Sequence, residues 1–146
     1  MSEMFAAVGC YAKSVTINGL TDWDTRNVTN MSMMFNYVGF FNAKTCNIGD
    51  LSEKQITKNG ITYKAWDVSN VINMKDMFRY SKLEFFGNIG NWNVSSVTDM
   101  SGMFEGSRQI KNYTLDLSAW DTGKVTKYEK FDQLYTGKII LPTWKN

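Results

Sequence analysis

The 146-residue sequence contains no histidine, and this absence excludes most of the common catalytic and metal-binding arrangements. Without an imidazole the chain cannot build a Ser-His-Asp or Cys-His nucleophilic site, a histidine general base or the HExxH zinc site. Carboxylate pairs remain as a route to acid–base catalysis, but the repeated aspartates described below are better explained as turn residues. We therefore expect a protein that is not an enzyme and that binds no cofactor.

Cysteine is scarce too, and neither sign of charge dominates. Cys10 and Cys46 occur at different phases of the repeat described below, which disfavours a disulfide, and without a CxxC pair we expect no metal site built on them. The 16 basic and 14 acidic residues leave a net charge of +2, which is too small to indicate a nucleic-acid-binding surface. No apolar run approaches the roughly 20 residues of a membrane span, so we expect no membrane insertion.

What the chain has in abundance is internal repetition, which decides the fold class. The phrase WNVSSVTDMSGMF at 92–104 recurs as WDTRNVTNMSMMF at 23–35 and WDVSNVINMKDMF at 66–78. A degraded copy, WDTGKVTKYEKF, stands at 120–131. Successive tryptophans are separated by 43, 26, 28 and 24 residues, so the unit has 24–28 residues and one copy carries an insertion.

Four apolar positions recur at fixed distances after Trp23, Trp66 and Trp92. In the second full copy they are Val71, Met74, Met77 and Phe78. Their spacing of three, three and one places the side chains on one face of a short helix, and the preceding asparagine or serine is a good N-cap. Alternating apolar residues before each tryptophan predict a short strand. The sequence therefore predicts an α/β solenoid of about four to five strand-turn-helix repeats.

The repeat resembles the BspA-type leucine-rich repeat, which is common in bacterial surface proteins and mycoplasma lipoproteins. Residues 85–104, FFGNIGNWNVSSVTDMSGMF, match the typical phrase of that family over one whole unit. The chain departs from it at the insertion, in the degraded copy and at Asn93, which replaces the usual aspartate. The resemblance implies a leucine-rich-repeat-like solenoid that serves adhesion or protein recognition at a bacterial surface.

The domain organisation follows from the repeat. We expect a single domain over 1–146, with an insertion at 43–65 and a C-terminal cap at 120–146, where polar substitutions are typical of a terminal repeat. Within the insertion, the pair Asn59-Gly60 between β-prone residues predicts a hairpin. Insertions in repeat proteins often lie on the binding face, although an enlarged repeat without a partner fits equally well.

Candidate binding residues follow from the strand alternation. Positions three and five before each tryptophan are expected to face the core, so positions two and four before it should form an open, soluble face. Together with the hairpin turn, this predicts a binding surface made of Thr62, Lys64, Asn88, Gly90, Asp116, Ser118, Asn59 and Gly60. Solvation alone would tolerate the same small and polar residues.

The aspartates that directly follow tryptophan could have either of two roles. Asp24, Asp67 and Asp121 occupy one phase, and a fixed phase favours a turn role, in which the carboxylate accepts a hydrogen bond from its own backbone. A stacked row of carboxylates would also suit calcium, but Asn93 interrupts the row. The sequence therefore favours the turn.

The sequence predicts a non-catalytic interaction or adhesion module with a protein or glycan partner. The alternative is a structural subunit of a phage or appendage assembly, because the segment MSEMFAAV at 1–8 begins on the core-facing ladder and leaves that end open to self-association. The segment AVGC at 7–10 lacks the basic start and apolar core of an export signal. We expect a cell-surface or secreted location if the chain is part of a longer exported protein.

Overall fold

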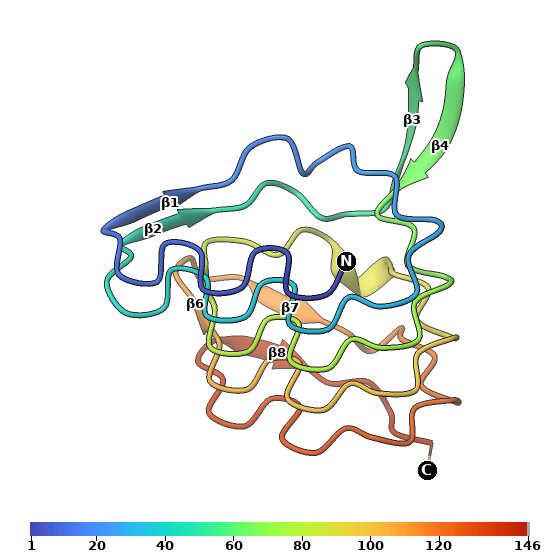
Figure 1. The fold of residues 1–146 in the computed structure, drawn as a ribbon. Helices are drawn as coiled ribbons and strands as arrows, with labels where there is room; N and C mark the ends of the chain where they lie inside the picture. Colours follow the sequence, from blue (N-terminus) through green and yellow to red (C-terminus); the bar gives the residue numbers. More distant parts are fainter. Residues whose placement is uncertain (146) are drawn as a thin grey trace.

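The structure, a computed structural model, describes residues 1–145 as short strands joined by irregular coils. The strands are β1 (Ser14–Thr16), β2 (Thr45–Asn47), β3 (Lys54–Lys58), β4 (Ile61–Ala65), β5 (Lys82–Leu83), β6 (Arg108–Gln109), β7 (Thr114–Asp116) and β8 (Lys138–Ile140), with one 3₁₀ turn, η1 (Ile89–Asn91). Strands β1–β2, β5–β6 and β7–β8 pair in parallel, and β3–β4 pair antiparallel. The repeat copies lie in sequence order along the molecule, from blue to red in Figure 1.

The predicted α/β solenoid of strand-turn-helix repeats is wrong. Within residues 1–145 there is no α-helix, and the only helical element is the three-residue turn η1. The segment expected to be helical in each copy is a run of tight turns instead. The leucine-rich-repeat-like architecture implied by the resemblance therefore does not describe this chain. In the same part of the chain no helix has the length and apolar character that crossing a membrane requires.

Backbone hydrogen bonds explain why no helix forms. We call the part of each copy from its first methionine to its phenylalanine the Met–Phe segment. In the copy at 66–78, the N–H of Met77 donates to the carbonyl of Met74 in its own copy, whereas the N–H of Phe78 donates to the carbonyl of Met103 in the next copy. The two kinds of bond alternate, and residues in the left-handed region, such as Asp76 with φ of 54°, recur among them. A helix would direct almost all of these N–H groups to carbonyls of the same copy. Here half of them join neighbouring copies.

The copies are also held in register at the position just before the first methionine. Asn30, Asn73, Asp99 and Lys127 form successive parallel bridges. The side chains of the first three accept hydrogen bonds from the N–H two residues on, at 2.9, 2.9 and 3.0 Å. These side chains therefore shape turns and do not cap a helix.

The prediction that the Trp-Val-Met-Met-Phe ladder is buried is confirmed. In one copy the ladder residues Trp66, Val71, Met74, Met77 and Phe78 are all fully buried. Phenylalanine rings of neighbouring copies stack on one another, with Phe78 at 5.5 Å between centroids from both Phe35 and Phe104. Tryptophan and phenylalanine rings at equal ladder positions therefore stack on one another between the first three copies, as expected of a repeat protein.

The hairpin expected at Asn59-Gly60 is present and projects from the stack (Figure 1). Both turn residues have positive φ, 53° and 77°, which is the geometry of a type I′ turn. Because the hairpin leaves the stack, the expectation that Ile61 faces the core is wrong, and its side chain is 59% exposed. The Tyr63 hydroxyl on β4 donates a hydrogen bond to the carbonyl of Asp22 at 2.7 Å, which ties the hairpin to the segment before Trp23.

The turn role of the residues after tryptophan is confirmed. Asp24, Asp67 and Asp121 accept hydrogen bonds from the N–H two residues further on, at 3.4, 3.0 and 3.1 Å, and Asn93 does the same at 3.2 Å. Cys10 and Cys46 are free thiols, and burial raises the pKa of Cys46 to about 12. Among residues 1–145 no group of three or more histidine, cysteine, aspartate or glutamate side chains is placed to hold a metal ion.

We predict that Asp76→Asn raises thermal stability slightly at pH 7. Asp76 is only 7% exposed, and this burial raises the pKa of its carboxyl above the ordinary value. The positive charges of Arg79, at 3.7 Å, and of Lys75 lower the pKa, whereas the negative charges of Glu105 and Asp99 raise it, and burial has the largest effect. The ionised carboxylate therefore opposes folding, and this penalty disappears as the pH falls through the raised pKa. Unfolding midpoints of both proteins between pH 4 and pH 8 should converge at the acidic end. A difference that grows toward low pH would contradict the prediction.

Candidate functional site

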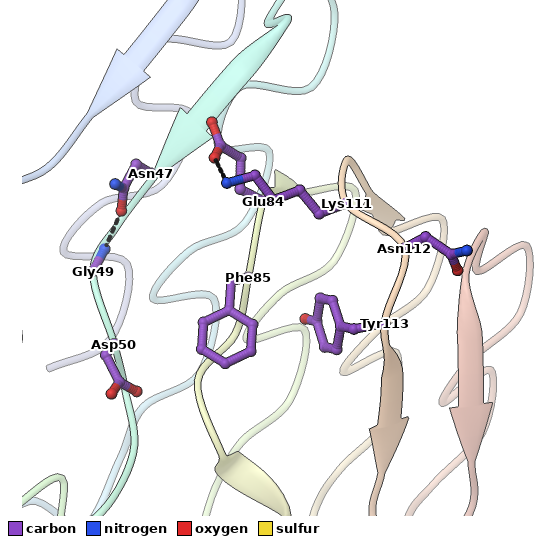
Figure 2. A pocket seen from close by; sticks show the side chains of 8 residues that line it. All are labelled: Asn47, Gly49, Asp50, Glu84, Phe85, Lys111, Asn112 and Tyr113. Carbon is purple, nitrogen blue, oxygen red and sulfur yellow. Dashed lines mark hydrogen bonds and ion pairs between the residues drawn. The ribbon is translucent and has the colours of Figure 1, made fainter.

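A groove crosses the strand side of the molecule between β2 and β7 (Figure 2). It consists of two adjoining hollows of about 570 and 230 Å³ that share Phe85 and Tyr113, and we call it the Phe85–Tyr113 groove. The larger hollow is also lined by Asn47, Gly49, Asp50, Glu84, Lys111 and Asn112. The smaller is also lined by Gly87, Asn88, Gly90, Thr114, Leu115 and Asp116.

The groove exists because the chain after β5 leaves the row of strands. The N–H of Glu84 still donates to the carbonyl of Cys46 at 3.0 Å, but the following residues form no strand. At Gly87 the backbone has φ of 80° and passes so close to the coil after β2 that a Cβ would lie 2.7 Å from the amide nitrogen of Leu51. Glycine is therefore required at this position, and the backbone at Gly87 forms part of the lining of the smaller hollow.

Phe85 is the main apolar feature of the groove. Its side chain is 45% exposed, whereas the neighbouring Phe86 is fully buried in the core. Figure 2 shows the rings of Phe85 and Tyr113 side by side, with centroids 5.1 Å apart at an interplanar angle of 68°. The Tyr113 hydroxyl accepts a hydrogen bond from the N–H of Phe86 at 3.0 Å, and burial raises the pKa of its phenol. The pair is therefore a fixed, uncharged aromatic surface.

Polar groups flank this aromatic pair. Glu84 and Lys111 form an ion pair at 2.9 Å on one side. On the other side, the amide oxygen of Asn47 accepts a hydrogen bond from the N–H of Gly49. One carboxylate oxygen of Asp50 accepts a hydrogen bond from the N–H of Ser52. Within residues 1–145 the amide nitrogen of Asn47 and the second oxygen of Asp50 have no hydrogen-bond partner. The groove thus offers both a donor and an acceptor beside an aromatic face.

The structure brings three of the predicted binding residues together. Asn88, Gly90 and Asp116 line the smaller hollow. Asn88 and Asp116 are exposed, and a hydrogen bond from Ser118 lowers the pKa of the Asp116 carboxyl. Gly90 is buried in η1, so the expectation that it faces outward is wrong. The three do not belong to stacked strands, because only Asp116 lies on one.

The other predicted residues lie outside the groove lining. Thr62 and Lys64 are on β4 of the hairpin, where their side chains contact Thr57 at 2.9 Å and Glu53 at 2.6 Å. Asn59 and Gly60 form the exposed hairpin turn, and Ser118 follows β7 as an exposed residue. Whether any of these positions binds a partner stays a prediction.

Sequence reasoning missed the residues that make the groove. Phe85, Tyr113, Asp50 and Lys111 lie on coils outside the Trp-to-Phe phrase that recurs within the chain, so the spacing of that phrase assigned no face to them. One signal was available in the pair Phe85-Phe86, because adjacent side chains in an extended segment point to opposite sides. Only one of the two rings could enter the core.

The fold and the groove define a repeat protein whose copies join through their backbones and which carries an open, partly aromatic surface groove. The chain belongs to the family described as "Mycoplasma protein of unknown function, DUF285", whose model matches residues 1–55 and 46–136. No curated protein matches the chain, and no solved structure does.

Proposed function

We propose that the chain is a non-catalytic interaction or adhesion module of a bacterial surface-type repeat protein, and that a partner binds in the Phe85–Tyr113 groove. The observation that supports this most is Phe85, a large apolar side chain left 45% exposed in the middle of a hollow. Exposed aromatic residues in concave surfaces are the usual anchors of binding sites.

The chemistry around Phe85 supports recognition of a polar partner. The free amide nitrogen of Asn47 can donate a hydrogen bond, and the free oxygen of Asp50 can accept one. A protein segment or a glycan presents groups of both kinds together with apolar surface. The partner is therefore a protein or a glycan, held by an aromatic face and a few directed hydrogen bonds.

Three further observations support the remaining parts of the proposal. The absence of histidine supports a non-catalytic role. The surface role is supported by the BspA-type resemblance of residues 85–104 and by membership of a mycoplasma family. A location at the cell surface, or secretion, goes with this proposal if the chain is part of a longer exported protein.

We predict that Phe85→Ser lowers binding to arrayed glycans or to immobilised host extracellular proteins about tenfold or more. Loss of an anchoring aromatic side chain typically costs at least about 1.4 kcal/mol, which is tenfold in affinity. The fluorescently labelled chain would be applied to both kinds of array, and the affinity for every positive spot measured for each variant.

Phe41→Ser is the matched control, because Phe41 is 51% exposed and lies outside the groove lining. Its affinity should equal that of the unsubstituted chain. Equal losses in both variants, or no loss in Phe85→Ser, would show that the groove is not the binding site.

A further inference from the structure

The Phe85–Tyr113 groove is negatively charged, although the net charge of the whole chain is +2. Its hollows are lined by three carboxylates, those of Asp50, Glu84 and Asp116, and among the described residues Lys111 is the one basic side chain in this lining. Lys111 is already paired with Glu84 at 2.9 Å. Within residues 1–145 neither Asp50 nor Asp116 forms an ion pair. The groove therefore carries an excess of negative charge beside its aromatic rings.

The carboxylate of Asp50 is held in place where the two hollows adjoin. One of its oxygens accepts hydrogen bonds from the N–H and from the hydroxyl of Ser52, and that hydroxyl in turn accepts the N–H of Asn88 at 2.6 Å. The same oxygen lies 2.5 Å from the position that a Cβ on Gly87 would take, and Gly87 lines the smaller hollow. The second oxygen of Asp50 is thus offered to a partner by a side chain that is already ordered, which reduces the entropy lost on binding.

Asp116 supplies a second carboxylate, from the wall that β7 forms. One of its oxygens accepts the N–H of Ser118 at 2.9 Å, and within residues 1–145 the other has no hydrogen-bond partner. Hydrogen bonding to Ser118 lowers the pKa of the Asp116 carboxyl, so this group is ionised at pH 7. In the view of Figure 2 the ring of Phe85 lies between Asp50 and Tyr113. An occupant of the smaller hollow would therefore meet the Phe85 ring and two carboxylates.

Elsewhere the chain itself shows which group suits such surroundings. The guanidinium of Arg79 lies 2.7 Å from Glu105 and 3.7 Å from Asp76. It also lies 4.9 Å from the centre of the Tyr80 ring. One arginine is thus held by two carboxylates and an aromatic face, the same kinds of group that the groove presents. A guanidinium suits them because it stacks on a ring, donates to carboxylates at the same time and is more weakly hydrated than an ammonium group.

We infer that the Phe85–Tyr113 groove binds an arginine side chain of a partner protein, with the guanidinium on the ring of Phe85 and between the carboxylates of Asp50 and Asp116. This inference rests on the proposed function and narrows the partner to a protein segment that carries an arginine. Charge complementarity is the reason for the choice, because the groove would repel a sulfated or sialylated glycan and would gain no charge attraction from a neutral one. The free amide nitrogen of Asn47 can donate to a carbonyl of the same segment.

N-acetyl-arginine amide is a probe for one such side chain, and its neutral isostere N-acetyl-citrulline amide is the matched control. Each compound would be titrated into the isotope-labelled chain while the NMR signals of the Ser52, Asn88 and Ser118 amides are followed, because these N–H groups lie beside the two carboxylates. We expect saturable shifts with the arginine compound and binding of the citrulline compound that is about tenfold weaker or more. Added salt should weaken the binding of the arginine compound, since it screens the charges.

Asp50→Asn and Asp116→Asn each remove one charge from the groove. The turns should persist, because an asparagine oxygen accepts the N–H two residues further on, as that of Asn93 does. Each variant should bind the arginine compound about two- to fivefold more weakly, as expected for the loss of an exposed ion pair. Asp22→Asn is the control, because its side chain is 53% exposed and outside the groove lining, and it should leave the affinity unchanged.

Equal binding of the two compounds, or equal affinities of Asp50→Asn, Asp116→Asn and Asp22→Asn for the arginine compound, would overturn the inference. Array binding that depends on Phe85, is confined to neutral glycans and is unchanged in Asp50→Asn and Asp116→Asn would also overturn it, while leaving the proposed function intact. If the arginine compound bound as expected but no array spot depended on Phe85, arginine recognition would stand and the proposed adhesion role would fail.

Discussion

Met77→Asp is expected to lower the free energy of unfolding by at least about 3 kcal/mol and the unfolding midpoint by about 10 °C or more. Met77 is fully buried in the ladder, in the coil that lies between two full neighbouring copies. A carboxylate there would lose its water without gaining a partner. It would also leave the volume of the methionine side chain partly unfilled. Thermal unfolding followed by circular dichroism measures the effect.

Ile72→Asp is the matched control for this substitution. Ile72 belongs to the same copy, but its side chain is 50% exposed, so a carboxylate at this position keeps its water. Its midpoint should stay within about 2 °C of the unsubstituted chain, as expected of surface changes of up to about 0.5 kcal/mol. If Met77→Asp were as stable as this control, the packing of the ladder between copies would be wrong.

Gly90→Ala is expected to cost about 1–3 kcal/mol, although it adds a single methyl group. Gly90 lies in η1, where the turn passes so close to β7 that a Cβ would overlap the carbonyl oxygen of Asp116. That atom belongs to the backbone of a paired strand, so it cannot rotate away as a side chain could. The substitution must displace either η1 or β7, and the second choice also moves one wall of the groove.

Gly123→Ala separates this overlap from the general effect of adding a methyl group. Gly123 is exposed, and the nearest atom to a Cβ there is a carboxylate oxygen of Asp121 at 3.3 Å, on a side chain that can move. Chemical denaturation of both variants should show a loss for Gly90→Ala only. Equal stability of the two variants would mean that η1 and β7 are farther apart than the structure places them.

The burial pattern could be read from the sequence because it depends on spacing alone. The repeated offsets of valine, methionine and phenylalanine mark side chains that must share one side of the backbone, whatever its conformation. The same holds for the hairpin, since Asn59-Gly60 suits a type I′ turn through its own backbone preferences. The turn role of Asp67 is local in the same sense, because its partner is only two residues away.

The helix prediction failed for a reason that lies outside any single copy. Offsets of three, three and one fit one face of a helix, but they fit a run of tight turns equally well. The choice depends on where the N–H groups find acceptors, and for Phe78 that acceptor is Met103, in the next copy. A sequence window of helical length does not contain this partner.

The amino-acid sequence by itself determined the repeat and its buried ladder through residue spacing, and it determined the hairpin and the turns because these depend on neighbours a few residues apart. The tertiary structure alone decided that the Met–Phe segments are turns and that a groove opens around Phe85 and Tyr113. It also decided that Gly90 is buried against Asp116. These features arise where copies 26 to 28 residues apart meet, as at Asn73, Asp99 and Lys127. Hydrogen bonds and close contacts at such distances depend on how the copies are placed in space.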